Sequence, residues 1–363
     1  MLFFRADGNE KIGAGHIMRC LSIARAAFDQ GEKVVFYTAG NEFSKVIKEK
    51  GIENIVLSSD FMKMESELVF LKKEILSRKP EFIFVDSYYV TKMYLASILE
   101  WCHSYGGKLI YIDDVMAFAY PCDFLVNYNI FGPDMKETYI KMYLEDGIKE
   151  GMDEFPKLML GLEYVPLRKE FTNLPPRVAR PDAKDILVST GGADTEHIAL
   201  EIARAIIDMP KETRGDLVFH ILVGTMNMDK AEIENIAAAC KNIVVHYNVK
   251  DMVSLMQSCD AAISAAGSTL YELCATQTPT ITYVVADNQI LGAEGFEKAG
   301  LMEYGGDVRA LGKEALAMCL IDKSIKLISN MQNKKYETIQ ILNGARSIMH
   351  GIECISEVEY DEL

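Results

Sequence analysis

The chain has 363 residues, 49% of them hydrophobic, which is enough for two domains that each bury a core. Its net charge of −15 and the lack of a Lys/Arg-rich block argue against nucleic acid or an anionic membrane as a partner. No apolar run reaches the ~18 residues of a membrane span, and no signal-peptide pattern precedes the first strand. We therefore expect a cytoplasmic protein without membrane insertion.

Eight cysteines are scattered along the chain without a Cys-x-x-Cys pair or a spacing typical of zinc sites. We expect reduced cysteines in the core, no metal and no cofactor.

Short β-rich runs alternate with helical patterns through the first half. Strands are expected at 2–4, 34–38, 54–57, 82–85, 109–112 and 124–127, and helices at 17–28, 42–50, 65–78 and 91–105. The run FIFV (82–85) is continuously apolar, as in a strand covered on both faces. The alternation predicts a doubly wound parallel sheet.

A Pro- and Arg-rich segment at 166–182 predicts a linker, after which the alternation restarts. Strands are expected at 185–189, 219–223, 243–246, 261–264 and 280–285, with helices at 197–208, 230–240, 250–258, 269–275 and 288–299. We predict an N-terminal domain over 1–165, a C-terminal domain over 183–323 and a helical tail over 324–363. Ligands of such sheets bind at the carboxyl ends of the strands.

The run IGAGHIMR (12–19) lies between the first strand and the first helix. Gly13 and Gly15 keep the turn free of bulk, and the helix that follows offers unpaired N–H groups to an anion such as phosphate. His16 stands at the helix start, where the positive end of the helix dipole favours the neutral imidazole that can accept a proton. Capping or solvation of His16 is the alternative.

Two glycine loops of the second half have the same strand–loop–helix setting. In STGGAD (189–194), Gly191 allows a backbone to approach a ligand, and Asp194 can cap the next helix. A well-built turn explains this loop equally well. In AAGST (265–269), Gly267 precedes Ser268 and Thr269, which can cap the helix or bind a diphosphate.

Polar side chains follow these loops. Glu272, one turn into its helix, can accept hydrogen bonds from both hydroxyls of a ribose, or only add a favourable charge near the helix start. Asp287, Asn288 and Gln289 stand together at the end of a strand, and capping would account for one of them. The three together indicate a sugar-binding edge.

These motifs resemble the nucleotide-sugar hydrolases of pseudaminic acid biosynthesis, which release UDP from UDP-2,4-diacetamido-2,4,6-trideoxy-β-L-altropyranose. Similar proteins occur in spore-coat polysaccharide synthesis. The resemblance extends to about residue 305 and rests on RADGNEKIGAGHIMRCLSIA (5–24), VDSYY (85–89), YIDDV (111–115), CDFLVNYN (122–129), LMLGLEYVPLR (158–168), VSTGGAD (188–194), AISAAGSTLYEL (262–273) and VADNQ (285–289). The second-half motif is shared with the wider GT-B glycosyltransferase group, including transferases of peptidoglycan lipid synthesis.

The resemblance implies a GT-B fold, with two Rossmann-like domains facing a cleft and UDP bound by the C-terminal one. It implies His16 as the general base and no metal. Together with the motifs themselves, it leads us to expect that the substrate is bound by Gly13, Gly15, Arg19, Tyr88, Gly191, Gly267, Ser268, Thr269, Glu272, Asp287, Asn288 and Gln289. In this fold the last helix often crosses back to the first domain.

The chain departs from the family pattern at two places. Ser87 stands where the family often has histidine, which puts one sugar contact in doubt. Tyr271 replaces the usual tryptophan, a tolerable aromatic exchange.

Three functions compete: a UDP-sugar hydrolase, a glycosyltransferase of the same fold, and a non-catalytic nucleotide-sugar binder. Transferases with lipid acceptors usually present a basic, apolar patch to the membrane, and the sequence shows no such cluster in the first domain. Asp113 and Asp114 are attributed to loop solvation and capping rather than to a metal. Asp7 can orient His16 or cap its loop, and we favour the cap. We expect a monomer.

Overall fold

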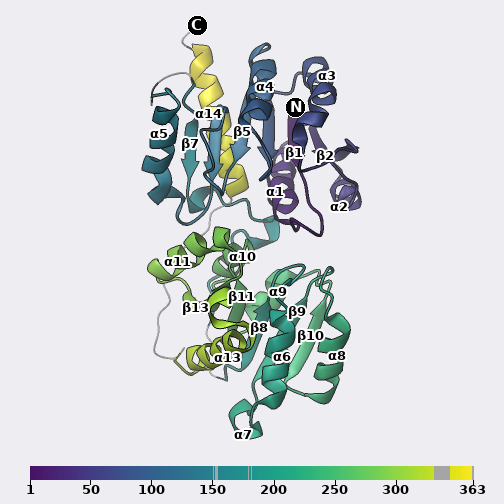
Figure 1. Ribbon diagram of the computed structural model, residues 1–363, viewed down its shortest axis with the longest axis vertical. Helices are drawn as coiled ribbons and strands as arrows, with labels where there is room; N and C mark the ends of the chain where they lie inside the picture. The colour runs from purple at the N-terminus through teal and green to yellow at the C-terminus, as the bar shows by residue number, and fades with distance from the viewer. Residues whose placement is uncertain (150, 152–153, 179, 181, 331–343, 362–363) are drawn as a thin grey trace. The chain divides into compact units, whose positions relative to one another are not determined.

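The computed structural model describes residues 1–363 except 150, 152–153, 179, 181, 331–343 and 362–363. It divides into two compact units (Figure 1): Met1–Lys169 with Leu342–Leu363, and Glu170–Ile341. In the described part of the chain, no helix is both long and apolar enough to cross a membrane.

The first unit is built on a seven-stranded parallel sheet with the order β3-β2-β1-β4-β5-β6-β7. Its strands are β1 Leu2–Ala6, β2 Val34–Thr38, β3 Glu53–Val56, β4 Phe82–Asp86, β5 Lys108–Ile112, β6 Phe124–Asn127 and β7 Lys157–Leu160. The order reverses between β1 and β4, so the chain leaves β1 towards one side of the sheet and reaches β4 on the other. At such a switch point the loops diverge and leave room for a ligand.

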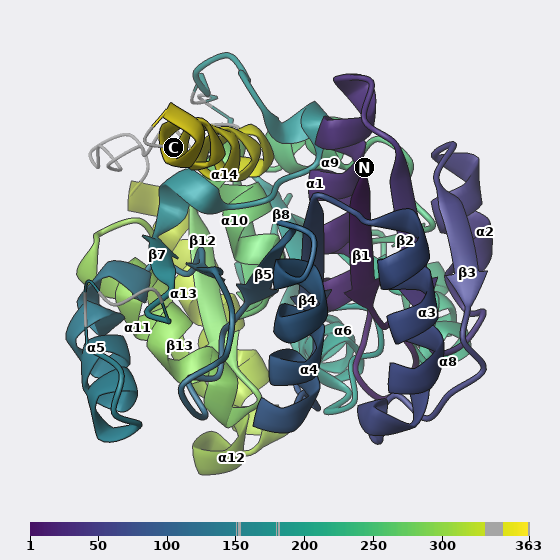
Figure 2. The ribbon, with the colours of Figure 1, turned by 90° about the horizontal axis from the view of Figure 1, so that it is seen from above.

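Helices cover both faces of this sheet. Those of the first unit are α1 Gly15–Asp29, α2 Ser44–Glu49, η1 Met64–Glu67, α3 Leu68–Arg78, α4 Lys92–His103, η2 Gly132–Met135, α5 Lys136–Glu145, η3 Leu162–Tyr164 and α14 Gly344–Asp361; η4 Lys169–Phe171 lies at the boundary of the units. Figure 2 shows α1 and α14 side by side on one face and α3 and α4 on the other, in agreement with their packing pairs. Phe3 and Ile83 face α3 and α4, which explains why the strands are apolar on both sides.

The second unit has a six-stranded parallel sheet with the order β10-β9-β8-β11-β12-β13. Its strands are β8 Asp185–Ser189, β9 Val218–Val223, β10 Ile243–Tyr247, β11 Ala261–Ala265, β12 Thr280–Val284 and β13 Glu303–Asp307. Its helices are α6 Ile198–Asp208, α7 Lys211–Arg214, α8 Lys230–Ala239, α9 Met252–Ser258, α10 Thr269–Ala275, η5 Asp287–Gln289, α11 Ile290–Lys298, α12 Val308–Leu311 and α13 Lys313–Asn330. Here the order reverses between β8 and β11.

Several elements were not expected from the sequence, among them β7, α5 and β13. Strand β13 reads EYGGD, a composition that disfavours strands. Its glycines are needed because a Cβ at Gly305 would lie 2.4 Å from Leu320 of α13, and because Gly306 has a φ of +132°. Close packing under α13 therefore selects glycine where propensity would select a β-branched residue.

The predicted C-terminal tail, 324–363, is divided between the two units. The predicted start of the tail, residue 324, falls within α13, whose buried Leu320 and Leu327 pack in the core of the second unit. Residues 331–343 of that predicted tail lie outside the described residues. Helix α14, the last element, packs on α1 and η3 within the first unit.

Candidate functional site

The switch point of the first unit gathers polar side chains from four successive strand ends. His16 and Arg19 come from α1 after β1, Asp86 ends β4, Asp114 follows β5 and Tyr128 follows β6. Because parallel strands end at one edge of the sheet, these residues meet although Arg19 and Tyr128, for example, are 109 positions apart. We call these five residues the His16 cluster.

His16 is held by a buried carboxylate. Its Nδ1 lies 2.6 Å from Oδ1 of Asp86, and the two side chains are 4% and 0% exposed. A carboxylate only accepts, so Nδ1 carries the hydrogen that it donates, and in the neutral imidazole the lone pair is then on Nε2. The arrangement is that of an imidazole base with an orienting carboxylate.

Arg19 ties the cluster together. Its Nε and Nη2 each donate to Asp86 at 2.5 Å, which is the two-pronged geometry that guanidinium and carboxylate favour. Its Nη1 donates to Asp114 and to the hydroxyl of Tyr128, each at 2.8 Å. Nη2 also lies 2.9 Å from Nδ1 of His16, since both donors converge on the same oxygen of Asp86.

The charges of the cluster keep Asp86 ionised. Burial alone would raise its pKa, but Arg19 and His16, through their charges and hydrogen bonds, lower it well below the usual range. Burial also disfavours the charged form of Arg19, yet Asp86 and Asp114 raise its pKa well above the ordinary value. The cluster therefore holds a fixed carboxylate against the imidazole of His16 at neutral pH.

Tyr88, predicted to line a sugar site, contacts the same cluster. Its ring meets that of His16 edge-on, with centroids 4.3 Å apart, and its hydroxyl lies 3.4 Å from Asp114. Burial and the charge of Asp114 raise the pKa of this hydroxyl, so it stays protonated. Tyr88 is 41% exposed, so it is a side chain that solvent and ligands can reach.

Two sequence-based interpretations need correction. Asp7 neither caps its own loop, as favoured from the sequence, nor orients His16; its carboxylate accepts from Arg5 at 2.6 Å and from the backbone N–H of Ala39 at 2.7 Å, which ties the end of β1 to that of β2. Asp114 is not a solvated loop residue, because it forms an ion pair with Arg19. Its neighbour Asp113 does cap its turn, by accepting from the backbone N–H groups that follow it.

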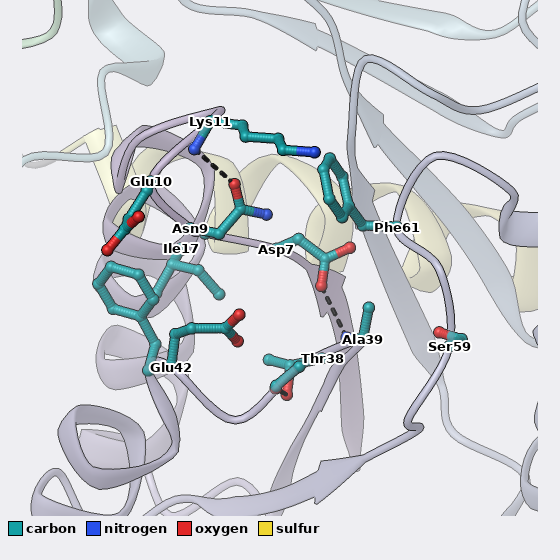
Figure 3. A pocket seen from close by; sticks show the side chains of 13 residues that line it. Asp7, Asn9, Glu10, Lys11, Ile17, Thr38, Ala39, Glu42, Ser59 and Phe61 are labelled. Atoms are coloured by element: carbon teal, nitrogen blue, oxygen red, sulfur yellow. Dashed lines mark hydrogen bonds between the residues drawn. The ribbon is translucent and has the colours of Figure 1, made fainter.

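A cavity of about 360 Å³ lies beside the loop that follows β1, at the ends of β1, β2 and β3 (Figure 3). Phe43 and Phe61 form apolar walls, and three carboxylates and one ammonium group line it, those of Asp7, Glu10, Glu42 and Lys11. Excess negative charge makes this cavity a poor site for phosphate. None of the residues predicted to bind the substrate lines it.

The fold explains one glycine of the β1 loop and not the other. Gly13 has a φ of +73° and forms an antiparallel bridge with Asn9, so the turn itself requires it. Gly15, the first residue of α1, has an ordinary φ, and a Cβ there would meet no atom within 4 Å. Neither strain nor crowding requires glycine at 15, which fits the close approach of a ligand.

In the second unit, the topology places the three predicted loops side by side. They follow β8, β11 and β12, which are neighbours in the sheet, with Ser189 level with Ser264 and Ala265 level with Tyr283. The loops therefore open at one edge, with the switch point between the first two.

The first two loops differ in whether the fold itself requires their glycine. Gly191 has a φ of +89°, so the turn explains it, and Asp194 caps α6 by accepting from Ile198 and Ala199. Gly267 has no positive φ, and a Cβ there would meet no atom within 4 Å. The glycine at 267 is thus unexplained by the fold, as expected where a ligand approaches the backbone.

Helix α10 starts directly after Gly267. Ser268 is its N-cap residue but makes no side-chain capping bond, and Thr269 is its first residue. The N–H groups of Leu270 and Tyr271 donate to the carbonyls of Gly267 and Ser268, so an anion would be met by the N–H groups at the very start of the helix and by the positive end of its dipole. Glu272 lies in the same first turn.

The third loop forms the short helix η5. Gln289 accepts from the backbone N–H of Val285 at 2.9 Å, so its side chain caps the strand end, while Asn288 is exposed. Asp287 accepts from Arg309 at 2.5 Å. Capping and ion pairing thus explain two of the three side chains within the unit itself.

Sequence reasoning missed Asp86, Tyr128 and Arg309. Asp86 could have been found, because a carboxylate at the end of a continuously apolar strand is a typical binding position. Tyr128 follows a weak strand signal, and Arg309 reaches η5 from beyond β13, a strand that the sequence did not reveal. Among the described residues, no group of three or more His, Cys, Asp or Glu is placed to hold a metal ion.

Comparison with known proteins defines the class. Residues 185–350 match the Glycosyltransferase family 28 C-terminal domain. UDP-GlcNAc 2-epimerase from Neisseria meningitidis superposes with a TM-score of 0.61 at 13% identity, covering 97% of this chain and 99% of that one. MurG of Acinetobacter baumannii superposes with a TM-score of 0.57 at 12% identity, covering 98% of this chain and 99% of that one. The chain has a GT-B fold, with two parallel-sheet α/β domains.

Relatives found by sequence point to a narrower group of proteins than the fold does. The UDP-2,4-diacetamido-2,4,6-trideoxy-β-L-altropyranose hydrolase of Campylobacter jejuni is 26% identical over 75% of this chain and 86% of its own length. The spore coat polysaccharide biosynthesis protein SpsG of Bacillus subtilis is 22% identical over 81% of this chain and 80% of its own length. The chain spans about half, 54%, of the uncharacterized protein MJ1062 of Methanocaldococcus jannaschii, at 24% identity over 76% of this chain. The resemblance to this hydrolase family is thus confirmed.

Proposed function

We propose that the chain hydrolyses a UDP-activated 2,4-diacetamido-trideoxy hexose, releasing UDP, in the synthesis of a surface polysaccharide or a nonulosonic acid. The observation that carries the proposal is the buried hydrogen bond of 2.6 Å between His16 and Asp86. A protein that only binds a nucleotide sugar has no need of an oriented imidazole, whereas a hydrolase needs one to activate water.

In the proposed reaction, Nε2 of His16 takes a proton from a water molecule as its oxygen attacks the anomeric carbon. The bond from that carbon to the phosphate oxygen breaks, and its electron pair leaves with UDP. Asp86 stabilises the imidazolium that forms, because its carboxylate remains ionised against Nδ1. Tyr88, in edge contact with the imidazole, is proposed to contact the sugar.

The UDP moiety is assigned to the second unit. Its diphosphate is proposed to bind at Gly267, Ser268 and Thr269, where α10 begins and where the glycine has no structural cause. Glu272, one turn further, is proposed to hold the ribose. Helix dipoles and N–H groups would offset the charge that develops on the leaving UDP.

A glycosyltransferase is the second candidate, favoured by the match of residues 185–350 to a glycosyltransferase domain. The same donor site and the same base would serve a sugar hydroxyl in place of water. The two functions differ only in the acceptor.

The deciding experiment is incubation of the purified chain with a panel of UDP-amino sugars without any acceptor. Release of UDP and free sugar in water alone would support the hydrolase. Release only after a sugar acceptor is added would select the transferase, and binding without release under both conditions would select the non-catalytic binder.

A further inference from the structure

A second surface of the first unit combines exposed apolar and basic side chains. It consists of residues 62–79, that is α3 and the turn before it, which we call the α3 face. Its apolar members are Met62, Val69, Phe70 and Leu76, of which Val69 is 86% exposed. Val69, Lys73 and Leu76 follow the spacing of one helix side, opposite the buried Leu71 and Ile75.

All four lysines of this segment are exposed: Lys63, Lys72, Lys73 and Lys79. Each of its three glutamates has a partner within the unit. Glu67 is buried against Arg5, Glu74 pairs with Arg78, and Glu65 accepts from Thr91. The α3 face therefore carries positive charge on a chain whose net charge is −15.

This distribution corrects an expectation from the sequence, which showed no basic, apolar cluster in the first domain. The linear order hides it, because glutamates are interspersed among the lysines along 63–79. Only the fold shows that the glutamates point to partners inside the unit and that the lysines remain outside.

We propose that the α3 face binds the surface of an anionic lipid bilayer without crossing it. Lysines on the rim attract anionic headgroups, and exposed apolar side chains between them enter the boundary between headgroups and acyl chains. An amphipathic helix lying flat on the sheet, as α3 does beside α4 in Figure 2, presents one side to such a plane. Nucleic acid would satisfy the lysines but would leave Val69 and Phe70 in water.

The position of Lys72 supports this orientation. Its ammonium lies 5.4 Å from the ring centre of Trp101 on α4, so a basic and an aromatic group meet at the edge of the face. Tryptophan and lysine are the side chains that anchor proteins at the interface between water and lipid.

The test is co-sedimentation of the full chain with vesicles of phosphatidylcholine alone and of phosphatidylcholine with phosphatidylglycerol at 3:1. We expect binding only to the anionic vesicles, and weaker binding at higher salt. The double variant Lys72→Gln/Lys73→Gln should lower the partition coefficient about 25-fold, at about five-fold per lysine. Val69→Ser/Phe70→Ser should lower it as well.

A matched control removes the same charge from the second unit, in Lys211→Gln/Lys241→Gln, where both lysines are exposed. This variant should bind the anionic vesicles like the unaltered chain. Equal loss of binding in control and α3 variants, or no binding of the unaltered chain to anionic vesicles, would overturn the proposal. Circular dichroism establishes that each variant is folded, and UDP release from soluble substrate is read separately.

Discussion

His16 is the residue on which the proposed chemistry depends. Replacing it by alanine removes the base but leaves the residues assigned to UDP untouched, because those belong to the second unit. We expect turnover to fall by about 10²- to 10⁴-fold, the usual contribution of a general base, with UDP affinity unchanged. Single-turnover kinetics and calorimetric titration with UDP measure the two quantities. Unchanged turnover would remove His16 as the base.

We expect Asp86 to contribute to the stability of the folded chain. Asp86→Asn leaves Arg19 buried with less negative charge beside it, and breaking a buried ion pair in this way costs about 3–5 kcal/mol. We expect a loss of this size in the free energy of unfolding at pH 7, measured by urea denaturation.

The pH dependence of that loss has a definite sign. The pKa of Asp86 is lowered in the folded chain, so its contribution is fully present above the ordinary value of about 3.9 and declines as the pH falls below it. The difference in unfolding free energy between the unaltered chain and Asp86→Asn should therefore be smaller at pH 3.5 than at pH 7. A difference that does not change with pH would contradict the assignment.

At this scale, the sequence predicted the location of single residues better than their partners. A glycine turn before a helix placed His16 and Arg19 at a strand end, where the structure has them. It could not pair His16 with Asp86, because that contact depends on which strand lies next to β1. The sequence offered only Asp7, near in the chain, as a carboxylate that could orient His16, whereas the actual partner is 70 positions away.

Among the elements, the loop before α10 and the loop after β8 allow a direct contrast. Gly267→Ala meets open space at an ordinary φ, so it should leave stability unchanged or raise it by up to about 1 kcal/mol. If a diphosphate approaches here, UDP affinity should fall about ten-fold or more, as when one hydrogen bond to a charged group is lost.

The comparison variant is Gly191→Ala, in which alanine must adopt a φ of +89°. It should lower the free energy of unfolding by about 1–2 kcal/mol. Thermal unfolding and titration with UDP distinguish the two effects. Normal UDP affinity in a stable Gly267→Ala chain would refute the diphosphate assignment.

Elements were predictable where local signals agreed with packing. The continuously apolar run 82–85 of β4 and the capped start of α6 follow from composition and turn chemistry. Strand β13 could not be predicted, because its two glycines are selected by close packing against Leu320 and by a positive φ at Gly306 rather than by strand propensity. Charge on the α3 face was equally hidden, since it depends on where three glutamates find their partners.

For the molecule as a whole, the order of the strands in each sheet determines which candidate site residues lie close together. Both sheets reverse their order at the strand before the first helix of the unit, so the strand-end residues converge there. Alternation of strands and helices predicted two doubly wound units, but not the seven- and six-stranded orders that fix which loops are neighbours. Those orders arise from long-range pairing, which leaves no local trace in a single sequence.

Metal dependence is a property of the complete reaction and can be tested on the whole chain. The charge that develops on UDP is expected to be met by N–H groups at the start of α10 rather than by a cation. UDP release should therefore be unchanged after treatment with EDTA and desalting, measured with the sugar that the acceptor-free panel identifies. Addition of Mg²⁺ or Mn²⁺ to the treated chain serves as the control. Loss of turnover with EDTA and its return with either cation would show that the leaving group is stabilised by a metal, and would move the diphosphate assignment away from backbone donors alone.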